Sequence, residues 1–308
     1  MQSIPPFSLP GQWFKGCLHT HTTQSDGTRH PAEVMAWYAG NGYDFLSLTD
    51  HNRVTDPFDF GKPPLLTIPG TEITALRGQV EYHIVALGIH DLPIAPHRDP
   101  QATIDAVNAA GGVCFVAHPY WHDLQLEDLL PLQGHIGIEI FNTGCWLEIQ
   151  KGHALVHWDA LLRRGQRPYG LAVDDAHFRD PDYGYGWITL RSERLDVSSV
   201  LKALCQGHFY ASMGPEIYDV QVNGRQVTVH CSPAYSVFLV GDYYNCPNAA
   251  HVWDKRQRDR LLPHQTGANM RDEPITEFTF QLSPNQRYLR VEVVDMNGLS
   301  AWSNPHFI

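Results

Sequence analysis

The segment Phe45-Leu46-Ser47-Leu48-Thr49-Asp50-His51 is an apolar run that ends in a carboxylate and an imidazole. Four other segments have the same form, each an apolar run followed by histidine or an acid: Lys15–His21, Ile68–Glu72, Val113–His118 and Leu171–His177. The carboxyl ends of parallel strands in a barrel lie on one face. We therefore expect the polar side chains of these five strand ends to converge on that face.

Strand and helix patterns alternate from about Lys15 to Tyr210, which is typical of an α/β barrel. The expected strands are Lys15–His19, Phe45–Thr49, Leu66–Pro69, His83–Leu87, Val113–Ala117, Ile136–Ile140 and Tyr169–Val173. The expected helices are Pro31–Tyr38, Gln101–Ala110, Trp158–Arg164 and Ser198–Gln206, each followed closely by glycine. The repeat of strand, loop and helix predicts a parallel sheet wrapped by helices.

The pattern changes after Ser212-Met213-Gly214-Pro215. Alternating segments without helices follow at Tyr218–Val222, Gln226–His230, Ser236–Val240, Glu277–Leu282 and Arg287–Val294, and Asn245–Asn269 is expected to be a polar loop. The sequence therefore predicts two domains, a barrel in residues 1–214 and a small all-β, sandwich-like domain in residues 215–308. No motif in the second domain indicates a ligand.

Composition excludes several classes of protein. The chain has 308 residues and a net charge of −11 without a basic run, which argues against nucleic acid as a partner, although a nuclease stays as a distant alternative. Its six cysteines form no CxxC pair, which argues against a zinc ribbon. No secretory signal or 18-residue apolar stretch is present, so we expect a cytoplasmic protein with no membrane partner. The sequence leaves open whether the protein forms a homo-oligomer.

Histidine is the unusually frequent residue, with 18 in the chain. His19 and His21 are two residues apart on an expected strand, so their side chains point to the same face. Imidazole and carboxylate ligands together suit zinc, manganese or iron, and the absence of neighbouring thiolates argues against a purely structural zinc site. The five strand ends therefore predict a metal centre, with a chance scatter of surface residues as the alternative.

These motifs resemble the polymerase-and-histidinol-phosphatase (PHP) family of metallohydrolases. The matching motifs are His19-x-His21 with Asp26-Gly27, Thr49-Asp50-His51, Gly70-x-Glu72, Tyr82–Gly88, Ala117-His118-Pro119 and Asp175-Ala176-His177. Further segments, Trp158–Leu162, His208–Pro215 and Ala301–Pro305, are similar to the CehA/McbA branch, named for carbaryl hydrolases. The resemblance implies a distorted (β/α)7 TIM-like barrel that holds two to three divalent metal ions, zinc, manganese or iron.

The resemblance also implies the ligands of each ion. The first site would take His19, His21, Glu72 and Asp175, the second Glu72, His83 and His118 with Glu72 bridging, and the third Asp26, His51 and His177. Asp26 stands where some relatives have histidine, and its Ser-Asp-Gly context is also ordinary turn chemistry. His83 begins its expected strand, so a core or rim histidine is the alternative for that residue.

Three residues outside the ligand set are candidates for catalysis. Asp50 could orient a ligand or a bridging water, or be a simple strand-end acid. Arg53 and Arg179 follow two of the metal motifs and could bind an anionic substrate, with an exposed surface charge as the alternative for each. For His122 we expect an exposed loop position ahead of one that lines the pocket.

The leading functional hypothesis is hydrolysis of a small phosphate ester, with a hydroxide that bridges the metal ions as the nucleophile. A carboxylic or carbamate ester hydrolase of the carbaryl-hydrolase type is the alternative, because a metal pair can activate attack on carbonyl and phosphoryl centres alike. In either case the partner is a small anionic or ester substrate. A non-catalytic binding protein is a third hypothesis, and the complete ligand set argues against it.

Overall fold

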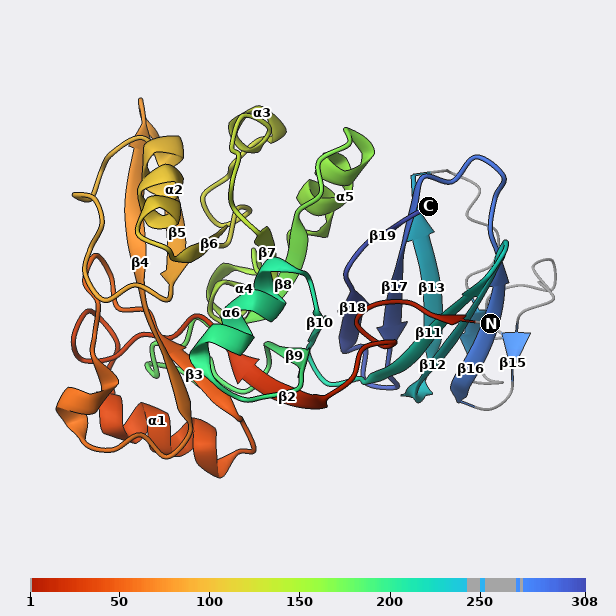
Figure 1. Cartoon of the computed structure of the whole chain (residues 1–308), viewed down its shortest axis with the longest axis horizontal. Helices are drawn as coiled ribbons and strands as arrows, with labels where there is room; N and C mark the ends of the chain where they lie inside the picture. The colour runs from red at the N-terminus through yellow and green to blue at the C-terminus, as the bar shows by residue number, and fades with distance from the viewer. Residues whose placement is uncertain (1, 243–249, 253–269, 272–273) are drawn as a thin grey trace. The chain divides into compact units, whose positions relative to one another are not determined.

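In the computed structural model, residues 10–209 form a mixed α/β unit built on one sheet of order β9-β2-β3-β4-β5-β6-β7-β8 (Figure 1). The strands are β2 (Gln12–Cys17), β3 (Phe45–Leu48), β4 (Leu66–Arg77), β5 (Val80–Leu87), β6 (Val113–Val116), β7 (Gly137–Asn142), β8 (Tyr169–Val173) and β9 (Trp187–Ser192). The pairs β2–β3, β3–β4, β6–β7 and β7–β8 are parallel. The pairs β2–β9, β4–β5 and β5–β6 are antiparallel.

The structure describes residues 2–242, 250–252, 270–271 and 274–308. Its contacts divide the chain into one unit of Pro10–Phe209 and another of Met1–Leu9 together with Tyr210–Ile308. This division falls between residues 209 and 210, whereas the predicted boundary lay after residue 214. The predicted loop Asn245–Asn269 lies outside the described residues, except for the short strand β14 (Ala250–Val252).

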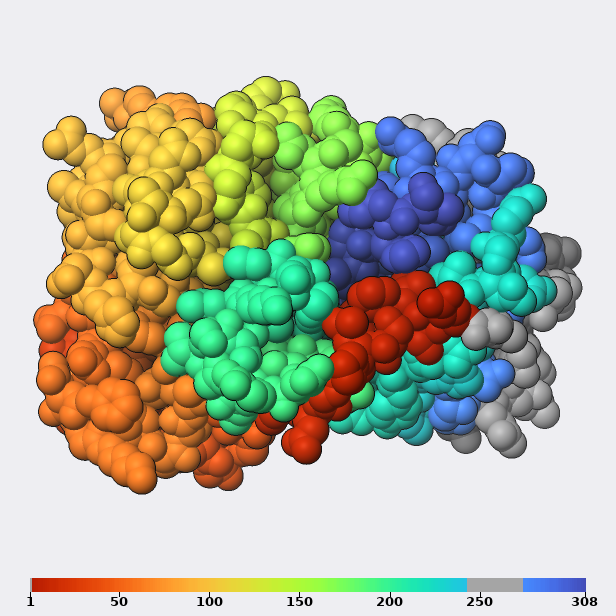
Figure 2. Space-filling model, viewed as in Figure 1, coloured from red at the N-terminus to blue at the C-terminus, as the bar shows by residue number. Residues whose placement is uncertain are grey.

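Helices cover the sheet of the larger unit. They are α1 (Pro31–Gly40), α2 (Pro100–Ala109), α3 (Leu126–Leu129), α4 (Thr143–Ile149), α5 (Leu155–Arg163) and α6 (Val197–Cys205), with a 3-10 turn η1 at Pro57–Phe60. Helix α1 contacts β3, α2 contacts β4 to β6, and α5 contacts β7. Side chains fill the spaces between these elements on the face drawn in Figure 2. No helix in the described part of the chain is long and apolar enough to cross a membrane.

Local sequence explains where these helices begin. Asp99 and Asp196 each accept backbone N–H bonds at the first turn of α2 and α6, and a proline follows Asp99 at the first helical position. Helix α6 then buries Val200 and Leu204 in one core with the strand residue Phe115. Burial of this kind is the main source of helix stability in a folded protein.

The observed sheet differs from the expected parallel one at two places. Strand β4 continues to Arg77, well past the predicted end at Pro69, and turns back at Gly78 to pair antiparallel with β5. Gly78 has a positive φ of 67°, which glycine adopts without steric cost in a tight turn. Glu72 therefore lies within a long hairpin strand. Strand β9 was not predicted, and it pairs antiparallel with β2.

The smaller unit contains two sheets. One has the order β1-β11-β12-β16, and the other runs β15-β14-β13-β17-β18-β10 with β19 beside β17. The strands are β1 (Gln2–Ser3), β10 (Phe209–Ser212), β11 (Ile217–Asn223), β12 (Gln226–Ala234), β13 (Ser236–Gly241), β14, β15 (Met270–Arg271), β16 (Ile275–Gln281), β17 (Tyr288–Val294), β18 (Ser300–Ser303) and β19 (His306–Phe307). Among the described residues of this unit the strand pairs are antiparallel, with β14–β15 as the parallel exception. Alternating burial along β16 agrees with a sheet that has one buried face.

Candidate metal centre

Backbone hydrogen bonds hold the ends of four strands together and so position the site. Beyond β2 and β8, Asp175 N–H donates to His19 O at 2.9 Å, and an isolated parallel bridge joins Thr20 to Ala176. Glu72 N–H, in β4, donates to Thr49 O at 3.0 Å just beyond β3. The backbone alone therefore places side chains that are distant in sequence close to one another.

Two of the site residues have strained backbone conformations. His118 has φ of 22° and Asp175 has φ of 54°, and each lies two residues after the end of its strand, β6 and β8 respectively. L-residues seldom adopt positive φ, and each such residue costs on the order of 1 kcal/mol. Strain of this kind persists where the surrounding structure holds it, and it is concentrated at functional sites. Here it occurs where two strands deliver side chains to one cluster.

Glu72 lies at the centre of the cluster, and five imidazoles face its two oxygens. Its Oε2 is 3.1 Å from His19 Nε2, 3.2 Å from His21 Nε2 and 3.1 Å from His51 Nδ1. Its Oε1 is 2.8 Å from His83 Nδ1 and 3.0 Å from His118 Nε2. The carboxylate is 1% exposed, so a single buried acid joins two groups of histidines.

Asp175 supplies a second buried carboxylate. Its Oδ1 lies 3.2 Å from His19 Nε2 and 3.0 Å from His21 Nε2. Both Asp175 Oδ1 and Glu72 Oε2 accept no hydrogen bond from the described residues, although imidazole nitrogens approach them closely. Buried acceptors without a hydrogen bond are costly. The lone pairs of these two oxygens face neighbouring imidazole nitrogens without forming hydrogen bonds, which is the arrangement expected of ligands that surround a cation.

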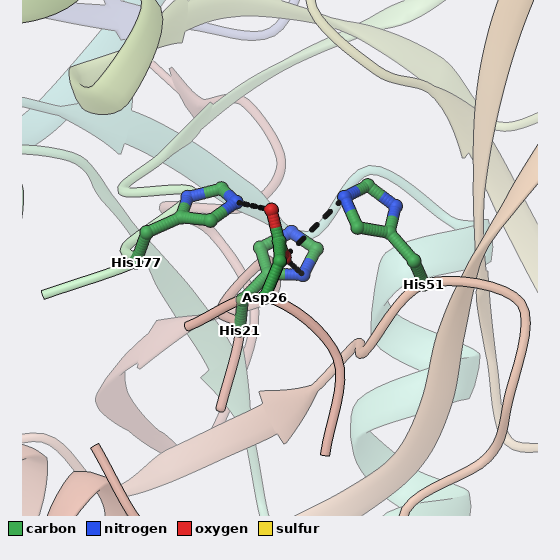
Figure 3. Close-up of side chains that lie close together, drawn as sticks. All are labelled: His21, Asp26, His51 and His177. Atoms are coloured by element: carbon green, nitrogen blue, oxygen red, sulfur yellow. Dashed lines mark ion pairs between the residues drawn. The ribbon is translucent and has the colours of Figure 1, made fainter. Parts of the chain in front are cut away.

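A third, more open group surrounds Asp26. Its Oδ2 lies 3.2 Å from His177 Nε2, and its Oδ1 lies 3.6 Å from His51 Nε2 and 3.8 Å from His21 Nδ1. Figure 3 shows Asp26 between the rings of His177 and His51, with His21 behind it. The Asp26 side chain is 41% exposed, so this group borders solvent.

The structure thus brings together every residue predicted to bind a metal. The described residues contain four groups in which the ligand atoms of the members lie within 4.8 Å of one another. The groups are His19, His21, Glu72 and Asp175; His51, Glu72 and His83; His83, His118 and His122; and His21, Asp26, His51 and His177. Histidine and carboxylate donors in such density suit zinc, manganese or iron. The residues present therefore fit a site for divalent metal ions.

Charges in the cluster compensate one another. Burial by itself raises the pKa of Glu72, but His83 and His19 hold it well below its usual range. Burial likewise raises the pKa of Asp175, and His19 and His21 overcome that effect and lower it. Burial lowers the pKa of His21, but the neighbouring carboxylates of Asp175 and Glu72 raise it to about 9. Without metal, protonated imidazoles therefore neutralise ionised carboxylates, and a bound metal ion would displace those protons.

Glu139 is a site residue that the sequence interpretation missed. Its Oε1 lies 2.7 Å from His19 Nδ1, and its Oε2 accepts the His118 N–H at 2.8 Å. Asn142 Nδ2 donates to Glu139 Oε2 at 2.9 Å and to Asp175 Oδ2 at 3.1 Å. A carboxylate on the far nitrogen of a ligating histidine fixes the ring orientation and tautomer. The available signal was an acid inside the apolar strand Ile136–Phe141, where an unpaired charge would be costly.

Asp50 accepts hydrogen bonds from hydroxyl groups and from one backbone N–H. It is fully buried and accepts hydrogen bonds from Thr22 N–H at 2.8 Å, from Ser25 Oγ at 2.8 Å and from the Thr55 hydroxyl at 2.5 Å. Ser25 Oγ in turn lies 3.4 Å from His21 Nδ1. Asp50 therefore organises the loop after β2. Ser25 links Asp50 to the predicted metal ligand His21.

The two predicted arginines have different positions. Arg179 borders the cavity over the cluster, and its Nη2 donates to Asp26 O at 2.6 Å and to Asp26 Oδ2 at 3.0 Å. Arg53 is exposed, donates to Gln24 O at 3.3 Å and is absent from the cavity lining. Of the two, Arg179 has the position from which a guanidinium can reach a bound anion.

The cavity above the cluster has a volume of about 620 Å³. Trp121, Leu147 and Glu148 form part of its wall, together with the loop that carries Arg179 and Asp180. Trp121 Nε1 donates to Glu148 Oε2 at 3.1 Å, and Leu147 is 42% exposed. A cavity of this size suits a small molecule with an apolar portion.

Asp174 anchors the loop beside the cavity. Its oxygens accept the N–H groups of residues 184–186 at 2.7 to 3.0 Å, Tyr38 Oη at 2.8 Å and the Thr143 hydroxyl at 3.0 Å. Asp174→Ala would leave several buried donors unpaired, so we expect it to destabilise the protein by about 3–5 kcal/mol. Urea denaturation measures this, with the exposed Asp180→Ala as the control. A loss below about 1 kcal/mol would contradict the anchoring role.

Comparisons with known proteins add a similarity of fold. No protein-family model matches the chain, and no curated protein matches it. The chain is similar to the crystal structure of a two-domain protein from Bacteroides vulgatus ATCC 8482, described as containing a predicted PHP-like metal-dependent phosphoesterase. The TM-score is 0.55 at 17% identity, and the alignment covers 100% of this chain and 97% of the other. The overall fold is thus one already observed in a two-domain protein of this size.

Two further solved structures align with part of the chain. One is an amidohydrolase from Chromobacterium violaceum, with a TM-score of 0.46, 19% identity and coverage of 61% of this chain and 96% of the other. The other is the lesion-specific endonuclease PfuEndoQ from Pyrococcus furiosus, with a TM-score of 0.45, 13% identity and coverage of 63% and 56%. These two alignments cover part of the chain, whereas the alignment with the Bacteroides protein covers all of it.

Proposed function

We propose that this protein is a metal-dependent phosphoesterase that hydrolyses a small phosphate ester. The observation that carries the proposal is the buried Glu72 carboxylate, whose two oxygens face five imidazoles while Asp175 faces two of the same rings. The fold similarity to a protein described as containing a predicted PHP-like metal-dependent phosphoesterase supports it. A structural role alone would not explain so many ionisable groups at one buried point.

The proposed ligands divide into three sites that share residues. They are His19, His21, Glu72 and Asp175 for the first, Glu72, His83 and His118 for the second, and Asp26, His51 and His177 for the third. When bound, such ions lower the pKa of a coordinated water and polarise the ester. Glu139 would hold the His19 ring for the first site through the 2.7 Å contact with Nδ1.

Charge around the cavity supports a substrate with few negative charges. Asp26, Glu148 and Asp180 border the cavity with Arg179 as a nearby cation, and the whole chain has a net charge of −11. A polyanion such as nucleic acid would meet repulsion on this surface, because it needs a basic face to displace counterions. Arg179 would bind a single phosphate group after releasing Asp26. We therefore favour a phosphomonoester with an apolar or aromatic leaving group near Trp121 and Leu147.

We further propose that the sheet of the larger unit closes into a distorted (β/α)7 barrel. The supporting contacts are the Thr20–Ala176 bridge and the His21 N–H donated to Ala176 O at 2.9 Å, beyond β2 and β8. The domain division that we propose follows the contacts at residues 209 and 210, in preference to the boundary drawn from sequence. The CehA/McbA branch and a cytoplasmic location remain proposals from sequence alone.

Activity profiling with defined metals tests the function. The full-length protein would be stripped with a chelator, reloaded with zinc, manganese or iron, and assayed on aryl phosphate monoesters, aryl phosphate diesters and aryl carbamates. We expect metal-dependent release of phosphate from a monoester. Turnover of the carbamates with no turnover of any phosphate ester would overturn the proposal in favour of the carbaryl-hydrolase type. Absence of all turnover by a metal-loaded protein would favour a binding protein.

A further inference from the structure

His122 lies beside two of the proposed metal ligands, although no motif marks it. Its ring centroid is 4.5 Å from that of His83 and 5.0 Å from that of His118. The three residues offer ligand nitrogens that all lie within 4.8 Å of one another. The side chain is partly buried, contrary to the exposed loop position expected from sequence.

The backbone turn after β6 brings His122 to this position. His122 N–H donates to His118 O at 3.4 Å and Trp121 N–H to the same oxygen at 3.0 Å, so the chain makes one helical turn. Residues four apart on such a turn lie on the same side. The fully buried Leu124 fixes the end of the turn, where its N–H donates to Pro119 O at 2.9 Å.

The buried ring nitrogen of His122 has no hydrogen-bond partner. Its Nε2 is inaccessible to solvent and makes no hydrogen bond to any described residue. A buried polar atom without a partner is destabilising, so it calls for an explanation. Packing explains part of the position of His122, because its ring packs edge-to-face against Trp121 with the ring centroids 4.9 Å apart. Packing does not explain an unpaired nitrogen next to two other imidazoles.

We propose that His122 is an additional ligand of the metal ion held by Glu72, His83 and His118. The inference rests on the proposed metal dependence and adds a ligand to it. With His122 the site would contain three imidazoles and one carboxylate, where the predicted set has two imidazoles and one carboxylate. A donor set richer in nitrogen favours zinc and neighbouring late transition metals over magnesium or calcium.

Metal titration of His122→Phe tests the proposal, because phenylalanine keeps an aromatic ring against Trp121 and removes the ligand nitrogen. The matched control is His90→Phe, at an exposed histidine outside all four groups. Chelator competition with zinc, and the visible absorption of the cobalt-loaded protein, would be measured on the full chain. We expect one ion to bind at least about 10-fold more weakly in the variant, with altered cobalt bands, and the control to match the wild type.

The outcomes separate the two proposals. Wild-type protein that binds neither zinc nor cobalt would overturn the metal dependence itself. Unchanged affinity and cobalt spectrum in a folded His122→Phe protein would overturn only the role of His122. If the variant does not fold, a zinc-loaded wild-type crystal structure decides the matter. We expect a Zn–Nε2 distance of about 2.0–2.1 Å for His122, and a distance beyond coordination would contradict the proposal.

Discussion

If the proposed function holds, Glu72→Gln will lower turnover of a phosphate ester by about 10³-fold or more. The Glu72 carboxylate faces both sets of imidazoles at close range, with His51 Nδ1 at 3.1 Å from one oxygen and His83 Nδ1 at 2.8 Å from the other. Glutamine keeps the shape but has a single neutral acceptor oxygen, so it cannot bridge two cations. Metal catalysis contributes several kcal/mol to the barrier, and each 1.36 kcal/mol is tenfold in rate.

Steady-state assays on the best phosphate ester, with metal content measured in the same samples, would check this result. Glu127→Gln is the matched control, because Glu127 is an exposed acid on α3 and lies outside the cavity lining. We expect the control to keep wild-type turnover. A folded Glu72→Gln protein that retains full activity and full metal content would contradict the central role of this carboxylate.

The convergence of the site was predictable from local patterns. Each short apolar run that ends in His or an acid is a self-contained signal, and the carboxyl ends of barrel strands must meet on one face. That reasoning predicts that His19, Glu72, His118 and Asp175 lie together, and the structure brings their side chains within contact, although Glu72 lies within β4 and not at its end. The exact roles of these residues in binding metal remain proposals.

The sheet topology was only partly predictable, because the sequence pattern of one strand does not show which other strand pairs with it. The apolar pattern of β4 is the same whether its neighbour is parallel or antiparallel, so the long hairpin with β5 was not recognised. The only local sign was Gly78, and a single glycine is a weak signal. Strand β1 pairs with β11 across more than two hundred residues, a contact that no local pattern reveals.

Glu139 was missed, and His122 was expected to be exposed, for a related reason. Their importance depends on neighbours that only tertiary structure supplies, namely the Nδ1 of His19 for Glu139 and the ring of His83 for His122. In sequence, Glu139 is one acid in an apolar strand, and His122 is one histidine in a short turn. A rule that gives weight to charged residues inside buried strands would have found the first but not the second.

Removal of bound metal will lower the melting temperature of the larger unit by about 8–16 °C. Metal at about 1,000 times its dissociation constant contributes about 4 kcal/mol to stability, and a unit of about 200 residues shifts by about 2–4 °C per kcal/mol. Calorimetry of chelator-treated protein, before and after zinc or manganese is restored, measures the shift. Glu72→Gln should show a much smaller shift, and an equal shift in that variant would place metal binding elsewhere.

The same experiment should depend on pH in a defined direction. The pKa of His21 is raised from 6.5 to about 9 because burial, which lowers it, is outweighed by the neighbouring carboxylates of Asp175 and Glu72. Its protonated form therefore stabilises the metal-free protein below pH 6.5, and this contribution is lost as pH rises through about 9. Metal must displace that proton, so its stabilising effect should increase from pH 6 to pH 8.5. A shift in melting temperature that is equal at both pH values would mean that metal does not compete with protons for this cluster.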